Sequence, residues 1–289
     1  MKRLLIVVAL AVALVAPGGP SPAEATGHAE RYYLSLGDSL AESYQPNGGL
    51  THGYTEEVFK AIRGDFDQLR HIKLGCGGET AASMIDTTVA GFCLYPDGAF
   101  DTQSQLDVAV DFLHAHRGSV GLITIDIGGN DVLACLDPTT QLLDQGCLDQ
   151  AFPATLADLG IVLATLQEAA PGVPIVGMNY YDAFLGLWVL GPDARAVAVH
   201  NAPIVADLNA QLTAAYQAAG VPVADVAGAF DSDNFTDSVL TKKWGEIPVN
   251  VANVCHGTWF CDDKYAFDVH ANTAGYAVIA GAFLDVIQP

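Results

Sequence analysis

A turn of small residues, Leu36-Gly37-Asp38-Ser39-Leu40-Ala41, closes the apolar stretch Tyr32–Leu36 near the N-terminal end of the chain. A short apolar stretch that ends on a turn is typical of a buried strand. A strand that leads into such a turn and then a helix places the serine at the carboxyl edge of a sheet, where open α/β folds bind ligands. We therefore expect Ser39 to be a nucleophile, while the alternative is an ordinary turn whose side chains bond their own backbone.

A histidine lies near the other end of the chain, in Phe267-Asp268-Val269-His270-Ala271-Asn272-Thr273, directly before a helix start. A serine hydroxyl is a poor nucleophile at neutral pH unless a base accepts its proton, and histidine is the side chain best suited to do so. We expect His270 to be this base, because the two groups need only meet in space.

Two further turns lie between these segments, and each follows an apolar stretch: Gly75-Cys76-Gly77-Gly78-Glu79-Thr80 and Ile127-Gly128-Gly129-Asn130-Asp131. Taken together, the four segments resemble the SGNH or GDSL family of serine esterases and lipases, whose four blocks supply Ser, Gly, Asn and His in this order. The resemblance covers most of the chain, because its blocks extend from residue 31 to residue 276.

The resemblance implies a role for each block. Ser39 would be the nucleophile and His270 the general base. The oxyanion hole would consist of the backbone N–H groups of Ser39 and Gly78 and the side-chain amide of Asn130. The resemblance also implies a three-layer α/β/α sandwich with a central parallel sheet of about five strands, of the flavodoxin-like SGNH hydrolase type, and no cofactor.

The third member of the triad departs from the usual spacing of this family, which is Asp-x-x-His. Here Asp268 stands two positions before His270, and Phe267 occupies the position three before it. We expect Asp268 to orient the imidazole. The main-chain carbonyl of Phe267 is the alternative, and Asp262 and Asp263 are more distant candidates.

The apolar patterns alternate between strand and helix, which predicts a parallel sheet covered by helices on both faces. We interpret residues 1–25 as a signal peptide and 26–289 as one domain, since no repeat or low-complexity linker divides them. The predicted strands are Tyr32–Leu36, His71–Leu74, Val120–Ile127, Val173–Met178 and Pro222–Val226. The predicted helices are Tyr54–Arg63, Gln103–His116, Leu156–Ala170, Pro203–Ala219 and Thr273–Ile287.

The N-terminal segment has the three parts of an export signal: basic Lys2 and Arg3, an uncharged apolar stretch from Leu4 to Ala16, and small residues up to Ala25. The apolar stretch is shorter than the roughly 20 residues that a membrane span needs. These features predict a protein that is secreted after cleavage near Ala25, with no stable membrane insertion.

Six cysteines in an exported chain predict a disulfide framework. Six cysteines allow about fifteen pairings, and the simplest joins neighbours: Cys76 with Cys93, Cys135 with Cys147, and Cys255 with Cys261. The alternative is six reduced, buried cysteines. We expect no metal site, because these spacings lack the close cysteine pairs of structural zinc sites.

The charge is strongly negative, with 12 Lys and Arg residues against 33 Asp and Glu residues and a net charge of −21. An acidic surface repels phosphate backbones and anionic membranes and favours solubility. We therefore expect no nucleic-acid partner. The resemblance to the SGNH or GDSL family implies a small-molecule or lipid acyl ester as substrate, and we expect a monomer.

The segments after the strands are long and are expected to build a substrate cleft; they are Cys76–Asp101, Cys135–Gln150, Ala183–Asp193 and Ala227–Lys264. The aromatic and aliphatic side chains of 180–188 fit an acyl chain, and the alternative is that they cap the sheet core. We expect a secreted carboxylic-ester hydrolase that acts on fatty acyl esters. The alternatives are a carbohydrate acetylesterase on the same fold and a noncatalytic surface-binding module.

Overall fold

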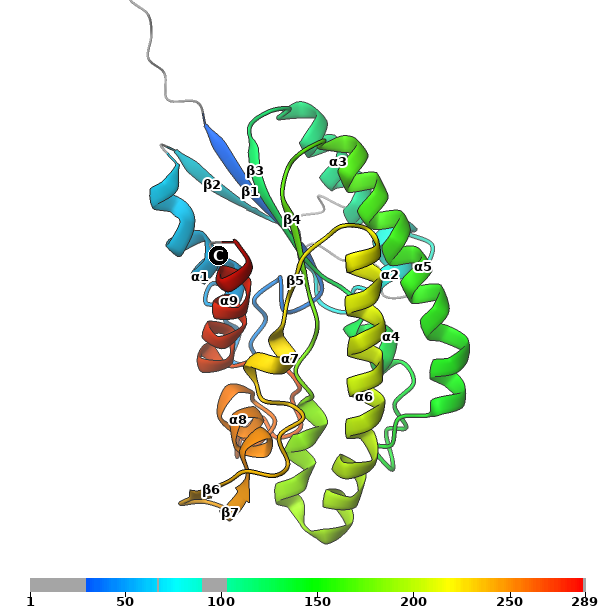
Figure 1. The fold of residues 1–289 in the computed structure, drawn as a ribbon, viewed down its shortest axis with the longest axis vertical. Helices are drawn as coiled ribbons and strands as arrows, with labels where there is room; N and C mark the ends of the chain where they lie inside the picture. The colour runs from blue at the N-terminus through cyan, green and yellow to red at the C-terminus, as the bar shows by residue number, and fades with distance from the viewer. Residues whose placement is uncertain (1–29, 67, 90–102, 288–289) are drawn as a thin grey trace, which may run out of the picture.

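The computed structural model describes residues 30–66, 68–89 and 103–287. Its central sheet has five parallel strands in the order β2-β1-β3-β4-β5 (Figure 1), which is the flavodoxin-like order. The predicted α/β/α architecture with a parallel sheet of about five strands is confirmed. The strands are β1 (Arg31–Gly37), β2 (Leu69–Lys73), β3 (Val120–Asp126), β4 (Ile175–Met178) and β5 (Val223–Ala224).

Helices cover both faces of the sheet (Figure 1). One face carries α1 (Tyr54–Ile62) and α9 (Thr273–Ile287), and the other carries α3 (Gln105–Ala115), α5 (Gln145–Ala169) and α6 (Pro192–Ala218). The shorter elements are the 3₁₀ helices η1 (Arg63–Asp65) and η2 (Ala183–Leu190), the helices α2 (Ala81–Ile85), α4 (Gly129–Leu133), α7 (Val226–Ala229) and α8 (Val249–Gly257), and the hairpin β6 (Ser238–Thr241) with β7 (Gly245–Pro248).

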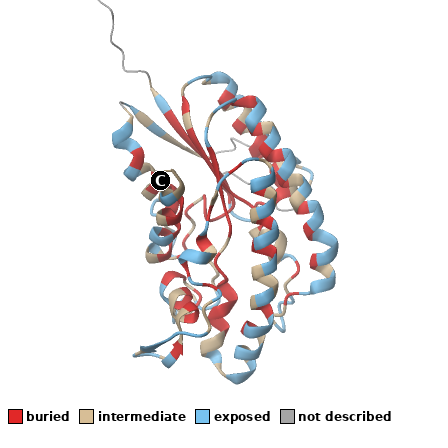
Figure 2. Ribbon diagram, in the orientation of Figure 1, coloured by how far each residue is buried: buried red, intermediate tan, exposed pale blue. Residues whose placement is uncertain are grey.

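Alternation along the strands divides the core into two layers. Tyr33 points toward the layer of α1 and α9, whereas its neighbour Leu34 points toward the layer of α3 and α5, because successive strand residues face opposite sides of a sheet. Both side chains are fully buried, and the buried residues in Figure 2 follow the sheet and the inner faces of the helices. The ring of Tyr54 on α1 stacks on the ring of Phe283 on α9 with centroids 4.8 Å apart.

Two helices begin earlier than the sequence predicts. We expected helices from Leu156 and from Pro203, but α5 begins at Gln145 and α6 at Pro192. Each contains an internal proline, Pro153 or Pro203, which normally ends a helix because it lacks an N–H. Packing compensates for the lost bond, since buried side chains lie on both sides of each proline.

All four of the segments that we expected to be loops contain regular structure. Cys76–Asp101 contains α2, and Cys135–Gln150 contains the start of α5. Ala183–Leu190 forms the 3₁₀ helix η2, and the segment 227–264 contains the β6–β7 hairpin and α8. Neither element has a clear periodic pattern, because η2 is apolar on almost every side and the hairpin strands have only four residues each. The expectation of irregular structure there is wrong.

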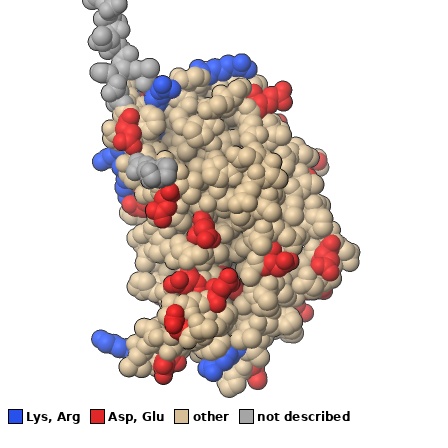
Figure 3. Space-filling model, in the orientation of Figure 1, with Lys and Arg blue, Asp and Glu red and all other residues tan. Residues whose placement is uncertain are grey.

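Helix α5 is long and apolar enough to cross a membrane by length and composition. In this fold it is a core helix, because Leu159, Val162 and Leu166 are fully buried against the sheet layer. Acidic side chains gather over the face that carries α7, while Lys and Arg lie toward the ends and one edge of that face (Figure 3).

Candidate active site

The turn that carries Ser39 begins at a position whose backbone conformation and neighbours strongly favour glycine. Gly37 has φ of +139°, and a Cβ atom there would lie 2.1 Å from Oδ1 of Asp126 on the neighbouring strand. The chain then forms a tight turn in which the N–H of Glu42 donates to the carbonyl of Asp38 at 3.0 Å, and the N–H of Tyr44 donates to the carbonyl of Ser39 at 2.9 Å. This turn fixes the serine at the end of β1.

Ser39 and His270 lie in direct contact although 231 positions separate them in the sequence. The distance from Ser39 Oγ to His270 Nε2 is 2.8 Å, and the distance from His270 Nδ1 to Asp268 Oδ1 is 2.8 Å. The three side chains therefore form a serine–histidine–aspartate chain of hydrogen bonds, which is the geometry that nucleophilic catalysis by serine needs.

The short spacing between Asp268 and His270 is accommodated by the local backbone. Phe267 adopts φ of +68°, and the Asp268 carboxylate also accepts a hydrogen bond from the main-chain N–H of His270 at 3.0 Å. Burial alone would raise the pKa of Asp268, but the hydrogen bonds from the ring and the main chain of His270 outweigh it and lower the pKa. Asp262 and Asp263 bond elsewhere, to main-chain N–H groups and to Lys243.

The histidine segment is held from three sides. The Tyr181 hydroxyl, after β4, donates to the carbonyl of Val269 at 2.7 Å, and the main-chain N–H of Trp259 donates to the carbonyl of His270 at 3.0 Å. The ring of Tyr44 packs against the imidazole with centroids 4.5 Å apart. These contacts determine the position of the ring relative to Ser39.

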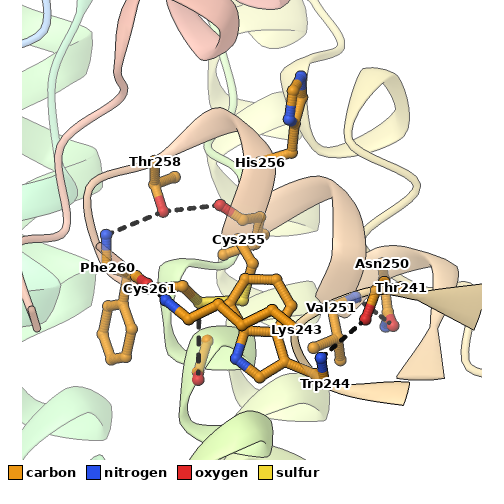
Figure 4. Close-up of a disulfide and its surroundings, with 12 residues drawn as sticks. Thr241, Lys243, Trp244, Asn250, Val251, Cys255, His256, Thr258, Phe260 and Cys261 are labelled. Atoms are coloured by element: carbon orange, nitrogen blue, oxygen red, sulfur yellow. Dashed lines mark hydrogen bonds between the residues drawn. A yellow bond between two sulfur atoms is a disulfide. The ribbon is translucent and has the colours of Figure 1, made fainter. Parts of the chain in front are cut away.

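Disulfides are present at two of the predicted pairs. Cys255 on α8 is bonded to Cys261, and Thr258 and Phe260 lie in the loop between them (Figure 4). Cys135 is bonded to Cys147. The third predicted pair, Cys76 with Cys93, lies outside the described residues because of Cys93.

The Gly78 and Asn130 segments lie beside the turn that carries Ser39. Gly78 has φ of +83°, and a Cβ atom there would meet no other atom within 4 Å, so its backbone conformation, rather than a contact within the protein, requires glycine. Asn130 lies in the first turn of α4, and its Nδ2 donates to the carbonyl of Glu79 at 2.9 Å.

The strand order explains why these segments meet. Successive crossovers reverse direction between β1 and β3, and in open α/β sheets this point opens a crevice at the carboxyl edge. Ser39 follows β1 and Asn130 follows β3. The two side chains therefore lie at the switch point of the sheet.

A cavity of about 290 Å³ opens at this point. Ser39, Gly78, Asn130 and His270 all line this cavity. The remaining walls are mainly apolar and come from the turn that carries Ser39, α4, α5, the start of η2, α6 and the histidine segment; they include Leu40, Val132, Leu133, Phe152, Phe184, Val205, Leu208, Leu212 and Val269.

The aromatic segment 180–188 divides between the two expected roles. Tyr180, Tyr181 and Phe184 line the cavity. Trp188 lies outside the lining, where its ring packs near Phe235 and beneath the guanidinium of Arg195. The first part of the segment therefore faces the cavity and the second part supports it.

Sequence reasoning missed the polar groups beneath the serine. Asp38 is almost fully buried, and its carboxylate accepts hydrogen bonds from the Leu40 N–H and the Tyr180 hydroxyl, each at 2.9 Å. Burial raises the pKa of Asp38. Asp126 on β3 is also buried and accepts from the Tyr54 hydroxyl at 2.7 Å. An acidic residue inside an apolar strand is a signal that could have revealed Asp126.

Comparison with known proteins agrees with this geometry. The family model for GDSL-like Lipase/Acylhydrolase matches residues 35–278. The chain belongs to this family. The matched region of this GDSL-like chain includes all four blocks, from the turn that carries Ser39 to the histidine segment, and confirms the resemblance inferred from the sequence. In the comparison with curated proteins, no sequence matches the chain.

Solved structures of other proteins share the fold of this GDSL-like chain. An acetylxylan esterase from Geobacillus stearothermophilus is 16% identical, with a TM-score of 0.50, over 90% of this chain and 94% of that protein. An extracellular lipase from Streptomyces rimosus is 18% identical, with a TM-score of 0.50, over 89% of this chain and 98% of that protein. At these identities the likeness concerns the fold.

Proposed function

We propose that the protein hydrolyses carboxylic esters through an acyl-enzyme on Ser39. The observation that carries the proposal is the hydrogen-bonded chain from Ser39 Oγ through His270 to Asp268, with both distances at 2.8 Å. Membership of the GDSL-like lipase/acylhydrolase family supports an ester hydrolase function.

The reaction consists of proton transfers between Ser39, His270 and the substrate. His270 Nε2 accepts the Ser39 proton while Oγ bonds to the ester carbonyl carbon, and the tetrahedral intermediate collapses as His270 returns the proton to the departing alcohol. A water molecule then donates a proton to His270 as its oxygen attacks the acyl carbon. The second tetrahedral intermediate collapses as the bond to Ser39 Oγ breaks and His270 returns the proton to Oγ, which releases the carboxylic acid and restores the free serine. The carboxylate of Asp268 holds the ring and stabilises its protonated form.

The negative oxygen of the intermediate would be bound by the N–H groups of Ser39 and Gly78 and by the Asn130 amide. An amide nitrogen carries two N–H groups, and one of those on Asn130 donates to Glu79, so the second is available for substrate. In other hydrolases one such donor contributes about 3–4 kcal/mol.

The lining of the cavity supports an acyl chain as the group bound beside Ser39. Its volume of about 290 Å³ is close to the lower limit of roughly 300 Å³ for small-molecule pockets, and most of its wall is apolar. An acetyl group would leave most of this apolar wall without contact. We therefore favour fatty acyl esters over acetylated carbohydrate, although the fold is shared with an acetylxylan esterase.

A fluorophosphonate probe tests the serine mechanism. The wild-type protein should be labelled at Ser39, and Ser39→Ala should abolish labelling while circular dichroism stays unchanged. Ser238→Ala, which removes an exposed serine on the β6–β7 hairpin, is the matched control and should label normally. A folded wild-type protein without labelling would favour the noncatalytic binding module instead.

A panel of esters tests the substrate class. Esters with acyl chains of two to sixteen carbons should show the highest kcat/KM above two carbons, and acetylated xylan should be a poor substrate. The highest rate on acetylated xylan would favour the carbohydrate acetylesterase.

We also propose that residues 1–25 direct export, that 26–289 form one domain and that the protein acts outside the cell as a monomer. The disulfides Cys135–Cys147 and Cys255–Cys261 support an oxidising compartment. Mass spectrometry of the protein purified from culture medium should find a mature N-terminus at Thr26.

A further inference from the structure

A buried glutamine forms two hydrogen bonds with the backbone at the end of β1, the strand that precedes Ser39. Gln105, at the start of α3, is 1% exposed. Its Oε1 accepts from the N–H of Gly37 at 2.7 Å, and its Nε2 donates to the carbonyl of Gly37 at 3.0 Å. These two bonds fix which end of the amide is oxygen, because a backbone N–H can only donate and a carbonyl can only accept.

The remaining N–H of that amide points at a buried carboxylate. Gln105 Nε2 donates to Glu79 Oε2 at 3.0 Å, and the Ser83 hydroxyl on α2 donates to the other oxygen of Glu79. Glu79 is fully buried. Neither the N–H of Gln105 nor the hydroxyl of Ser83 has to compete with solvent for this acceptor, so the network is rigid.

The same glutamate is bonded to the segments that carry the donors of the proposed oxyanion hole. It follows Gly78 directly in the sequence, and its main-chain carbonyl accepts the bond from Asn130 Nδ2 at 2.9 Å. Glu79 thus bonds to Asn130 through its backbone and, through Gln105, to the residue that lies two positions before Ser39.

We propose that Glu79 and Gln105 are positioning residues for ester hydrolysis, which set the distance between the nucleophile and the donors of the oxyanion hole. This inference rests on the proposed function. The nucleophile attacks the carbonyl carbon while the donors bind its oxygen, so the nucleophile and the donors must keep their spacing throughout the reaction. Neither side chain lines the cavity, so they act through Gly37 and Asn130.

The protonation state of Glu79 indicates which substitution should keep its hydrogen bond with Gln105. Burial raises the pKa of Glu79 to about 7, the bonds from Ser83 and Gln105 act against this, and the charges of Asp38 and Asp131 add to it. Both the neutral and the charged carboxyl can accept from Gln105. A neutral glutamine at position 79 also offers this acceptor, whereas leucine has the size without it.

The test measures kcat and KM for Glu79→Leu, Glu79→Gln, Gln105→Leu and the double variant Glu79→Leu/Gln105→Leu. Each leucine variant should lose kcat by about 10²-fold, the loss associated with a misplacement of roughly 1 Å, with KM nearly unchanged. Glu79→Gln should keep kcat near the wild-type value. The double variant should lose no more than the worse single variant, because both act through one connection.

Asn201→Leu is the matched control. Asn201 on α6 is also fully buried, and its side-chain amide accepts from the N–H of Leu143 and donates to the carbonyl of Gln141. It does not line the cavity. The variant should lose stability and keep kcat per folded molecule.

A second pair of variants keeps the test decisive if a leucine variant does not fold. Gln105→Glu removes the N–H that donates to the Gly37 carbonyl and places two carboxyl groups in contact, so it should lower kcat. Glu79→Gln keeps the acceptor for Gln105 and should keep kcat. Wild-type kcat in the leucine variants or in Gln105→Glu, or losses that multiply in the double variant, would overturn the positioning role while labelling of Ser39 upholds the hydrolase. A wild-type protein that neither labels nor hydrolyses esters would overturn both proposals.

Discussion

Asp268 contacts His270 twice, because its carboxylate accepts one hydrogen bond from the ring Nδ1 at 2.8 Å and another from the main-chain N–H at 3.0 Å. The two residues stand only two positions apart, so the turn itself aligns carboxylate and ring. A residue three positions before the histidine is therefore not needed in this geometry.

Asp268→Asn should lower kcat by about 10³- to 10⁴-fold, because the amide favours the wrong tautomer of the ring, as in other serine hydrolases. KM should change little. Steady-state kinetics with a soluble ester checks this, with Asp262→Asn and Asp263→Asn as controls that keep wild-type kcat. A large loss in either control instead would assign the orienting role to that aspartate.

Asn130→Ala should lower kcat by about 10²- to 10³-fold, since it removes one donor to the negative oxygen. Binding of the ground state depends less on this donor, so KM should stay within a few-fold of wild type. Asn253→Ala, which removes an amide bonded to the carbonyl of Phe230, should leave kcat unchanged. Equal losses in the two variants would contradict a specific role for Asn130.

Val205→Phe should shorten the acyl chain that the enzyme accepts. Val205 lines the cavity from α6, and each methylene that loses its apolar contact costs about 0.8 kcal/mol of binding, or roughly fourfold in kcat/KM. Acetate esters should be hydrolysed as before, while esters of eight or more carbons should lose at least tenfold. Val199→Phe, at an exposed position on the same helix, should leave the chain-length profile unchanged.

Loss of the Cys255–Cys261 bond should reduce both stability and kcat. The bond closes a short loop, for which chain entropy predicts about 2 kcal/mol. This loop also carries the N–H of Trp259 that donates to His270, so its loosening affects the base. Cys255→Ala/Cys261→Ala should lose more kcat per folded molecule than Cys135→Ala/Cys147→Ala, as measured by kinetics beside urea denaturation.

Glu79 should make the folded state less stable as the pH rises. Burial raises its pKa in the folded protein to about 7, above the roughly 4.3 of an unfolded chain, so the folded state holds the proton more tightly. The contribution of Glu79 is present in full below about pH 4 and is lost as the pH rises through 7. The free energy of unfolding of wild type relative to Glu79→Gln should therefore fall between pH 4 and pH 8. Urea titrations at a series of pH values give the free energy of unfolding of both proteins. If the difference between wild type and Glu79→Gln does not change with pH, the shifted pKa is contradicted.

Local sequence was sufficient to predict the turns of the site where the residue type itself determines the backbone conformation. The turn at Gly37 and the positive φ at Gly78 both require glycine, and a small-residue turn after an apolar strand is visible in the sequence. The start of α6 was not predictable in this way, because Pro203 indicates a helix start while buried contacts along the helix let it continue through the proline.

The sequence by itself determined the parallel α/β fold, the four turns at the edge of its sheet and the family, because strand periodicity and turn residues are local properties. Only the tertiary structure decided that Asp268 rather than Phe267 contacts the imidazole, and that Glu79 and Gln105 join the segments that carry the nucleophile and the proposed oxyanion-hole donors. These contacts depend on side-chain direction and on distances between segments far apart in the chain. The packing of the helices against the sheet sets both.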